Sequence, residues 1–413
     1  MDYVVKGRDK HYNILWLSYI AYSIIYILGI NFDGIPMAAV FFAIFALTVI
    51  VFVFKRLSFD FTNRGRIVWL IYLLLCIWLA MMYIRSDVSF FVSPRLYDVM
   101  AYFGVVLLLV KPFPFVANMF DFGYKFNYIY LFIFFVPIAL SDNSITQMFL
   151  ETFPVFAIYI FLTNKYHSNK HILLAFVILV LSLLVATFEA RRNLMLTFGL
   201  YIMFGGIMFF MNGKAKSSEI KLLTALLVLL MLIAGVGLYK IESSGMFSTI
   251  SGRATENTRE EVLVAYAIDM ANTKDLVIGR GMGGEYYNPG VDKDTESGEY
   301  NDYRPHIECA YLEWILKGGI IYLLLYLILF IVAIWRGFKS KNALCKASAL
   351  IVFVQLIDMV PFGLHAFNLK AFMIWLAVSV CLDDNIRRMS DEEITAELFT
   401  KKTKLLPWQK NSK

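Results

Sequence analysis

The sequence predicts an all-α polytopic membrane protein, and three observations support that fold class. Hydrophobic residues make up 59% of the 413 residues, while charged residues make up only 17%. A soluble globular chain is nearer one-half apolar and one-quarter charged. The mean hydropathy is +0.65, and the apolar residues gather in long runs instead of alternating with polar ones. These features exclude a disordered chain, a coiled coil and a nucleic-acid-binding domain.

Apolar runs of about 20 residues can cross the hydrocarbon core of a bilayer as helices, and about twelve such runs occur. No alternating segments of strand length occur, so helices are the expected spanning structure. The fourth run is interrupted by Lys111, Pro112 and Pro114, and the fifth is short. The predicted spans are residues 13–30, 36–54, 67–84, 97–116, 127–142, 145–163, 171–188, 191–211, 221–239, 308–335, 344–361 and 365–381.

The basic residues of the loops predict the orientation of these spans, because cytoplasmic loops are enriched in Lys and Arg. With twelve spans and both termini in the cytoplasm, the short basic loops fall on one side. The first 13 residues are polar and a full-length apolar run follows, so we expect no cleavable signal peptide. The predicted organisation is nine helices over 1–239, a large extracytoplasmic loop at 240–307, three helices over 308–382 and a cytoplasmic tail at 383–413.

Short motifs predict local structure outside the spans. Ser390 with Glu393, and Thr258 with Glu261, form capping boxes that open helices. The helix that begins at Thr258 should run to about Ala271 and lie on the membrane. The stretch Gly279–Gly284 fits GxGxxG but has no strand before it, so it indicates a tight loop that can approach a ligand or a helix closely, not a dinucleotide site. The four cysteines have unrelated spacings and predict neither disulfides nor a zinc site.

Two adjacent arginines occur in a short outer loop, against the usual charge bias. Arg191 and Arg192 follow Glu189 at the junction of the seventh and eighth spans. Their presence predicts a site for an anionic ligand, and the alternative is a pair of interfacial anchors.

Charged residues within the spans fall in the outward halves. Such residues usually face a bundle interior or a water-filled cavity. Together with the arginine pair they predict a polar cavity open to the outside, although each could also be a locally paired or snorkelling side chain. The residues are Glu151, Lys317, Asp358 and Lys370, with His365 close by.

The tenth span is longer than a bilayer requires. Its 28 residues would extend about 42 Å against a core of about 30 Å, so its first two turns should stand outside the core. At 100° per residue, His306, Glu313 and Lys317 fall on one stripe. The stripe predicts that a histidine, a carboxylate and an amine face one direction at the mouth of the bundle, and the alternative is an exposed interfacial histidine.

The order of these features resembles the O-antigen polymerase and O-antigen ligase superfamily of bacterial polysaccharide assembly. An arginine at the junction of the seventh and eighth spans is followed by a large outer loop with arginines, a Gly-x-Gly turn and a histidine before a long helix containing Gly-Gly-Ile. The resemblance is best over 185–335. It implies a glycosyltransferase of the inner membrane, independent of metals and cofactors, that uses an undecaprenyl-diphosphate-linked donor on the outer face. A chain-length regulator and a flippase are the implied protein partners.

The same resemblance implies roles for individual residues. Either Arg191 or Arg192 corresponds to the first family arginine, and either Arg259 or Arg253 corresponds to the loop arginine. Arg280 in the Gly-x-Gly turn is a further candidate for binding the diphosphate. His306 takes the position of the family histidine. The family more often has His-Asn there, whereas this chain has His306-Ile307.

The chemistry is consistent with these residues. Arginine forks can stabilise a leaving diphosphate without a metal. His306 would position or deprotonate the acceptor hydroxyl with Glu313 to orient it, and Glu189 or Glu313 is the next candidate base. Polymerase is favoured over ligase, because no feature marks a lipid A site. A flippase or transporter is disfavoured, because it would show repeated halves and broken helices at the midplane. A structural scaffold is also disfavoured, because it would not need the outward arginines.

Overall fold

The computed structural model describes residues 3–5, 10–28, 31–32, 35–36, 63–86, 108–109, 111–134, 143–189, 191–213, 258–271, 273–293, 300–307, 309–361 and 369–401. The described chain is mostly helical, and five of its helices are long and apolar enough to cross a membrane. The helical membrane fold class is therefore compatible with the structure. The predicted spans at 36–54, 97–116 and 221–239 lie wholly or mainly outside the described residues.

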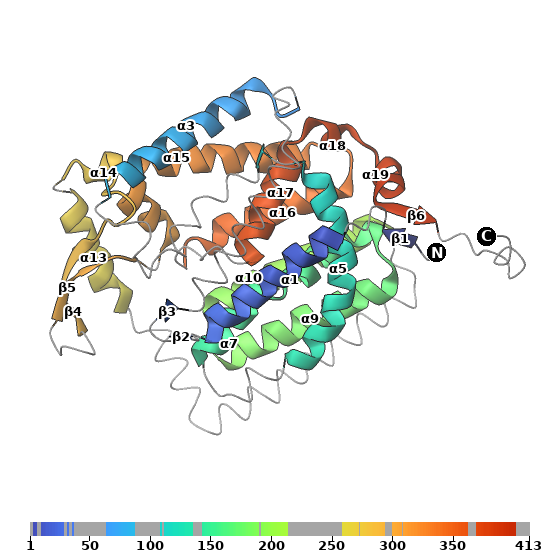
Figure 1. Cartoon of the computed structure of the whole chain (residues 1–413), viewed down its shortest axis with the longest axis horizontal. Helices are drawn as coiled ribbons and strands as arrows, with labels where there is room; N and C mark the ends of the chain where they lie inside the picture. Colours follow the sequence, from blue (N-terminus) through green and yellow to red (C-terminus); the bar gives the residue numbers. More distant parts are fainter. Residues whose placement is uncertain are drawn as a thin grey trace, which may run out of the picture.

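Among the described residues, the helices are accompanied by three two-stranded antiparallel sheets (Figure 1). The helices are α1 (Lys10–Leu28), α3 (Arg66–Ile84), α5 (Pro112–Ile133), α7 (Asn143–Thr152), α8 (Val155–Leu162), α9 (Asn169–Phe188), α10 (Arg192–Met211), α13 (Thr258–Ala271), α14 (Asp275–Ile278), α15 (Ala310–Phe338), α16 (Ala343–Asp358), α17 (Leu369–Leu382), α18 (Asp384–Arg388) and α19 (Asp391–Leu398), with a 3₁₀ turn at Asn164–Tyr166. The strands are β1 (Tyr3–Val5), β2 (Asn31–Phe32), β3 (Ile35–Pro36), β4 (Tyr286–Lys293), β5 (Tyr300–Arg304) and β6 (Phe399–Lys401).

The core is built around α15, which packs against α16, α17 and α3 (Figure 1). Aromatic rings fill the α15–α17 contact, where the ring centroids of Tyr326 and Trp375 lie 5.5 Å apart. A small residue allows the helices to approach, because a Cβ at Gly337 would lie 2.7 Å from both Ala349 Cβ and Cys381 Sγ. Small residues at such contacts are typical of helices that pack within membranes.

Helix α5 differs from the predicted boundaries of the fourth and fifth spans. Residues 117–126, predicted to be a loop, are helical. The chain breaks at Lys111 instead, because Pro112 has no amide hydrogen and suits the first helical position. Lys125 does not end a helix. It pairs with Asp121 one turn earlier at 3.1 Å, which supports the helix.

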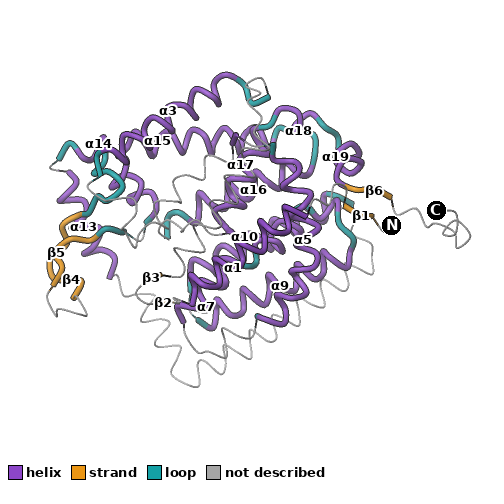
Figure 2. Tube along the Cα trace, viewed as in Figure 1, coloured by secondary structure: helices purple, strands orange, loops and turns teal. Residues whose placement is uncertain are grey.

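Both ends of the described chain lie at the same end of the molecule. Strand β1 pairs antiparallel with β6, with Tyr3 opposite Lys401. The β4–β5 hairpin and α13 lie at the other end (Figure 2). The capping box of Ser390 and Glu393 is formed as predicted and opens α19.

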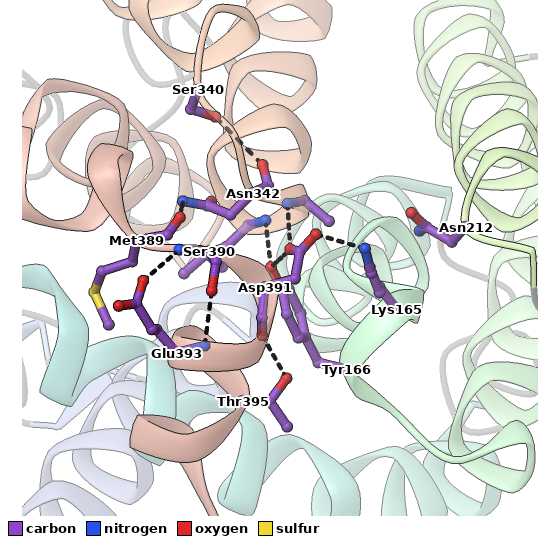
Figure 3. Close-up of polar contacts among 12 residues, drawn as sticks. Lys165, Tyr166, Asn212, Ser340, Asn342, Met389, Ser390, Asp391, Glu393 and Thr395 are labelled. Carbon is purple, nitrogen blue, oxygen red and sulfur yellow. Dashed lines mark hydrogen bonds and ion pairs between the residues drawn. The ribbon is translucent and has the colours of Figure 1, made fainter.

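Asp391 fixes α19 to the bundle (Figure 3). Its carboxylate accepts hydrogen bonds from Lys165 Nζ at 2.5 Å, from the Ala343 amide at 2.8 Å and from the Tyr166 hydroxyl. Burial raises the pKa of Asp391, but the hydrogen bonds from these three groups outweigh that effect and hold it below its ordinary value. Three separate segments therefore meet at one ionised carboxylate.

The tenth predicted span contains a break that the sequence analysis did not predict. Gly319 has φ of 74° and ψ of 178°, so the helix of α15 is interrupted there. The part after the break, about 19 residues, is close to the length that a bilayer core requires. The part from Ala310 to Gly318 forms a separate short helix, at the place where the sequence predicts two turns outside the core.

The break in α15 receives the glycine loop at 279–284. The amides of Arg280 and Gly281 donate to the carbonyls of Leu316 and Lys317 at 2.7 and 2.9 Å. A Cβ at Gly279 would lie 2.4 Å from the Lys317 carbonyl oxygen, and one at Gly319 would lie 2.1 Å from that of Val277. Both glycines have positive φ. Only glycine therefore allows this backbone contact.

We expect Gly319→Ala to destabilise the protein, because the new methyl group has no space and the backbone conformation disfavours it. The strain of such a conformation costs about 1–3 kcal/mol before the steric overlap is added. Thermal unfolding of the purified protein in detergent measures the loss. Gly199→Ala in α10 is the matched control, since a Cβ there meets nothing within 4 Å. Equal unfolding temperatures for the two variants would contradict this account.

Candidate functional site

The predicted pair of His306 and Glu313 is present at the start of α15. His306 Nδ1 lies 3.1 Å from Glu313 Oε1, and the Ile307 amide donates to Glu313 Oε2 at 3.0 Å. His306 does not lie on the helical stripe, because α15 begins only at Ala310. The contact forms because the extended segment before the helix folds back over its first turn. The His306 side chain is 44% exposed, while that of Glu313 is 3% exposed.

Lys317 is buried beneath this pair. Its ammonium lies 3.7 Å from Glu313 Oε1 and donates to the carbonyls of Pro305 at 2.6 Å and Gly284 at 2.8 Å. Because its side chain is only 3% exposed, it ties three segments together instead of lining an open cavity. Burial of an unpaired Glu313 carboxylate would be costly, so the adjacent cation stabilises it.

Two residues that were not predicted from the sequence hold the site in place, Trp78 in α3 and Arg85 directly after it. Arg85 donates to the carbonyls of Ile278, at 2.9 Å, and Gly279. Trp78 Nε1 donates to the Gly318 carbonyl at 2.7 Å, beside the break in α15. One signal for Arg85 was available: like Arg191, it is an arginine at the predicted outer end of a span, against the charge bias.

Arg280 is bound to carboxylates of α13 and α14. Its Nε donates to Asp275 at 2.8 Å and its Nη1 donates to Asp269 at 2.5 Å. Burial lowers the pKa of Arg280, but the hydrogen bonds to Asp269 and Asp275 raise it above its ordinary value. With two carboxylates neutralising it, the guanidinium holds the loop together. These contacts give no support to the predicted role of Arg280 in binding a diphosphate.

Two of the predicted cavity residues form a buried ion pair. Lys370 Nζ lies 2.7 Å from Asp358 Oδ2, and Thr197 donates to Asp358 Oδ1 at 2.8 Å. Their side chains are 4% and 1% exposed, so the pair joins α10, α16 and α17 and does not line an open cavity. Glu151 accepts from Gln147 at 2.9 Å and is also buried. His365 lies outside the described residues.

The arginine pair lies at the same end of the bundle as His306. Arg191 is the N-cap residue of α10 and Arg192 is its first residue, and Glu189 precedes Arg191 by two positions. Further along α10, the Thr197 hydroxyl donates to Asp358, the last residue of α16. The residue after Asp358 is Met359, and its carbonyl accepts from the amide of Ala310 at the start of α15. Arg259 lies in the first turn of α13, and Arg253 lies outside the described residues.

No protein-family model matches this chain, and no curated protein matches it either. Within the described residues, no group of three His, Cys, Asp or Glu side chains is placed to hold a metal ion. The assignment of function therefore depends on the geometry of the site and on the sequence pattern.

Asp269 should couple the stability of the segment that contains α13 and the β4–β5 hairpin to pH. Burial raises the pKa of Asp269, but hydrogen bonds from Arg280 and the Tyr287 amide lower it below the ordinary value of 3.8. The ionised form is thus favoured in the folded loop, so its stabilisation is complete above pH 3.8 and is lost as the pH falls through the lowered pKa. We expect proteolysis of the β4–β5 hairpin to accelerate below that pH.

Asp269→Asn should accelerate cleavage already at neutral pH and remove the acid-dependent step. Hydrogen bonds between charged groups each contribute about 1.5–3 kcal/mol. Asp302→Asn, on β5 of the same hairpin, is the control and should keep the step. An unchanged pH dependence in Asp269→Asn would show that other carboxylates control the loop.

Proposed function

We propose that this protein is a polysaccharide polymerase that joins undecaprenyl-diphosphate-linked repeat units on the outer face of a bacterial inner membrane. One observation carries the proposal: an accessible histidine is hydrogen-bonded to a buried carboxylate where the predicted outer loop meets the tenth span. A histidine oriented by a carboxylate is the usual arrangement for general base catalysis.

The reaction proposed is a glycosyl transfer with a balanced proton. The acceptor hydroxyl oxygen forms a bond to the anomeric carbon of the donor, and the bond between that carbon and the diphosphate oxygen breaks. Undecaprenyl diphosphate leaves with the electron pair of the broken bond. The hydroxyl proton passes to Nε2 of His306, since Nδ1 donates to Glu313, and the carboxylate stabilises the imidazolium that forms.

The leaving diphosphate requires positive charge in this scheme. Arg191 and Arg192 are the main candidates, with Arg259 or Arg253 as the loop arginine, because a guanidinium can bind two phosphate oxygens at once. Arg280 is not included, since two carboxylates already occupy its donors. The chemistry requires no metal or cofactor.

The proposed topology has about twelve spans, with both termini in the cytoplasm and the 240–307 loop outside. Two structural features support it. The pairing of β1 with β6 brings the ends of the chain together, as an even number of spans requires. Two basic residues of the predicted cytoplasmic loops, Lys165 and Arg336, form ion pairs with Asp391 and Asp384 of the predicted cytoplasmic tail.

Two alternative functions differ from the proposed one in what happens to the lipid-linked glycan. An O-antigen ligase would share the site but transfer the glycan to a lipid A core. A flippase or transporter for lipid-linked oligosaccharides would move the donor without cleaving it. Analysis of undecaprenyl-linked intermediates in a deletion strain discriminates them. Single repeat units accumulate without a polymerase, long lipid-linked chains without a ligase, and unflipped units without a flippase.

The topology is tested by single cysteines in a variant whose native cysteines are replaced by serine. Tyr303→Cys, exposed on β5, should react with an impermeant thiol reagent in intact spheroplasts. Lys339→Cys, exposed at the end of α15, should react only after the membrane is permeabilised. The opposite pattern would overturn the proposed orientation.

Replacement of Arg191 or Arg192 by alanine should abolish polymer for at least one of the two. Lysine should restore little activity, because an ammonium lacks the bidentate fork. Polymer length in membranes supplied with lipid-linked repeat units measures the effect, and Arg388→Ala on α18 serves as a control for loss of an arginine elsewhere. Wild-type activity in the Arg191→Ala, Arg192→Ala double variant would contradict the proposed role of the arginine pair in binding the diphosphate.

His306→Ala should lower the rate of polymerisation roughly 100-fold or more, the usual contribution of general acid–base catalysis. Binding of the lipid-linked donor should change little, because the arginines bind the diphosphate. His306→Gln tests the alternative that His306 only hydrogen-bonds the acceptor, since that variant would then keep much of the activity. Wild-type rates in His306→Ala would remove this residue from the site, and Glu189 or Glu313 would become the candidate base.

A further inference from the structure

Helix α13 exposes apolar side chains on the surface of the protein. Between Val262 and Ala271, every exposed side chain is apolar, and Ile268 is 61% exposed. A helix that faces water carries polar residues on its exposed side. The exposed residues are Leu263, Val264, Ala267, Ile268 and Ala271.

The large side chains on the opposite side of α13 are buried within the protein. Tyr266 and Met270 pack against Tyr286, Ile307 and Leu316 in a small separate core. Asp269 faces the same region, where it binds Arg280. The apolar residues on the outside are therefore not required to fold the outer loop, and an apolar surface of this kind marks an interaction site.

The neighbouring helix α14 connects this surface to the apolar stripe of α3. Ile77, Met81 and Ile84 are exposed along α3, which is one of the helices suited to crossing a membrane, and Ile84 is 80% exposed. The next residue of the chain, Arg85, binds the carbonyls at the end of α14. In α14, Leu276 and Val277 are exposed in turn. The apolar surface thus continues from the predicted span onto the outer loop.

We propose that α13 and α14 rest on the outer leaflet of the bilayer, with the exposed apolar residues at the boundary between headgroups and acyl chains. Lys274, exposed immediately before α14, has an apolar stem and a charged end that suit this boundary. The inference rests on the proposed membrane topology and not on glycosyl transfer. One consequence is that His306 is held close to the membrane surface, where the diphosphate of a lipid-linked donor lies.

The test uses the purified full-length protein, without native cysteines, in nanodiscs made with or without lipids brominated on their acyl chains. A fluorophore is attached at Ile268→Cys or at Val277→Cys. Ile77→Cys on α3 is the control for lipid contact, and Glu392→Cys, exposed on α19, is the control for water contact. Brominated lipid should quench the fluorophores at 268 and 277 to the same extent as that at 77, and leave that at 392 unchanged.

The controls separate the two ways in which the experiment can fail. Quenching at 77 without quenching at 268 and 277 would overturn the proposed surface and leave the topology standing. Absence of quenching at 77 would overturn the membrane-spanning role of α3, on which the proposed surface rests. A disulfide between two copies of unlabelled Ile268→Cys, together with no quenching of the labelled protein, would assign the surface to a second copy of the chain and also overturn the proposal.

A double variant tests whether the quenching depends on the apolar face of α13 and not on the label itself. Val264→Glu with Ile268→Glu should abolish quenching at Val277→Cys, because the two carboxylates oppose insertion of the apolar face. Thr273→Glu, exposed between α13 and α14, is the matched control for an added charge and should retain most of the quenching. Unchanged quenching in the double variant would overturn the role of α13.

Discussion

The part of the protein around His306 depends on one close contact between two backbone segments, made possible by glycines that have no side chains. The glycine loop at 279–284 lies in the break of α15, and a methyl group at either Gly279 or Gly319 would overlap with carbonyl oxygens. The break exposes amide and carbonyl groups that a continuous helix would use internally. The loop and Trp78 satisfy some of them, so break and loop stabilise each other.

The position of His306 follows from that contact through Lys317. The ammonium reaches the carbonyl at the end of the glycine loop, the carbonyl before His306 and the Glu313 carboxylate. A buried lysine with these partners fixes the relative positions of three segments that are distant in sequence. Glu313 is then held where it meets both the imidazole and the Ile307 amide. The result is a histidine that contacts a carboxylate which is itself buried and held by further contacts, as the proposed general base requires.

The sequence predicted the helical class and the local motifs because both depend on residues that are close along the chain. Capping at Ser390 and the end of α13 near Ala271 are of this kind. The hydrogen bond between His306 and Glu313 was predicted on a wrong geometry, since the histidine precedes the helix. The break at Gly319, the role of Arg85 and the pairing of Asp358 with Lys370 could not be derived in this way. Each depends on which segments meet in space, and periodicity carries no information about that.

The distribution of buried charge separates structural from chemical roles in this protein. Asp358 with Lys370 is a buried pair, and removing one member of such a pair costs about 3–5 kcal/mol. Arg280 and its two carboxylates also pair within the protein, although they are partly exposed. Such groups stabilise contacts between helices or within the loop. At the His306 site, by contrast, the carboxylate and the ammonium are buried while the imidazole is accessible. A titratable group that is oriented by buried charges and still reachable from outside is the arrangement expected of a residue that exchanges a proton with a substrate.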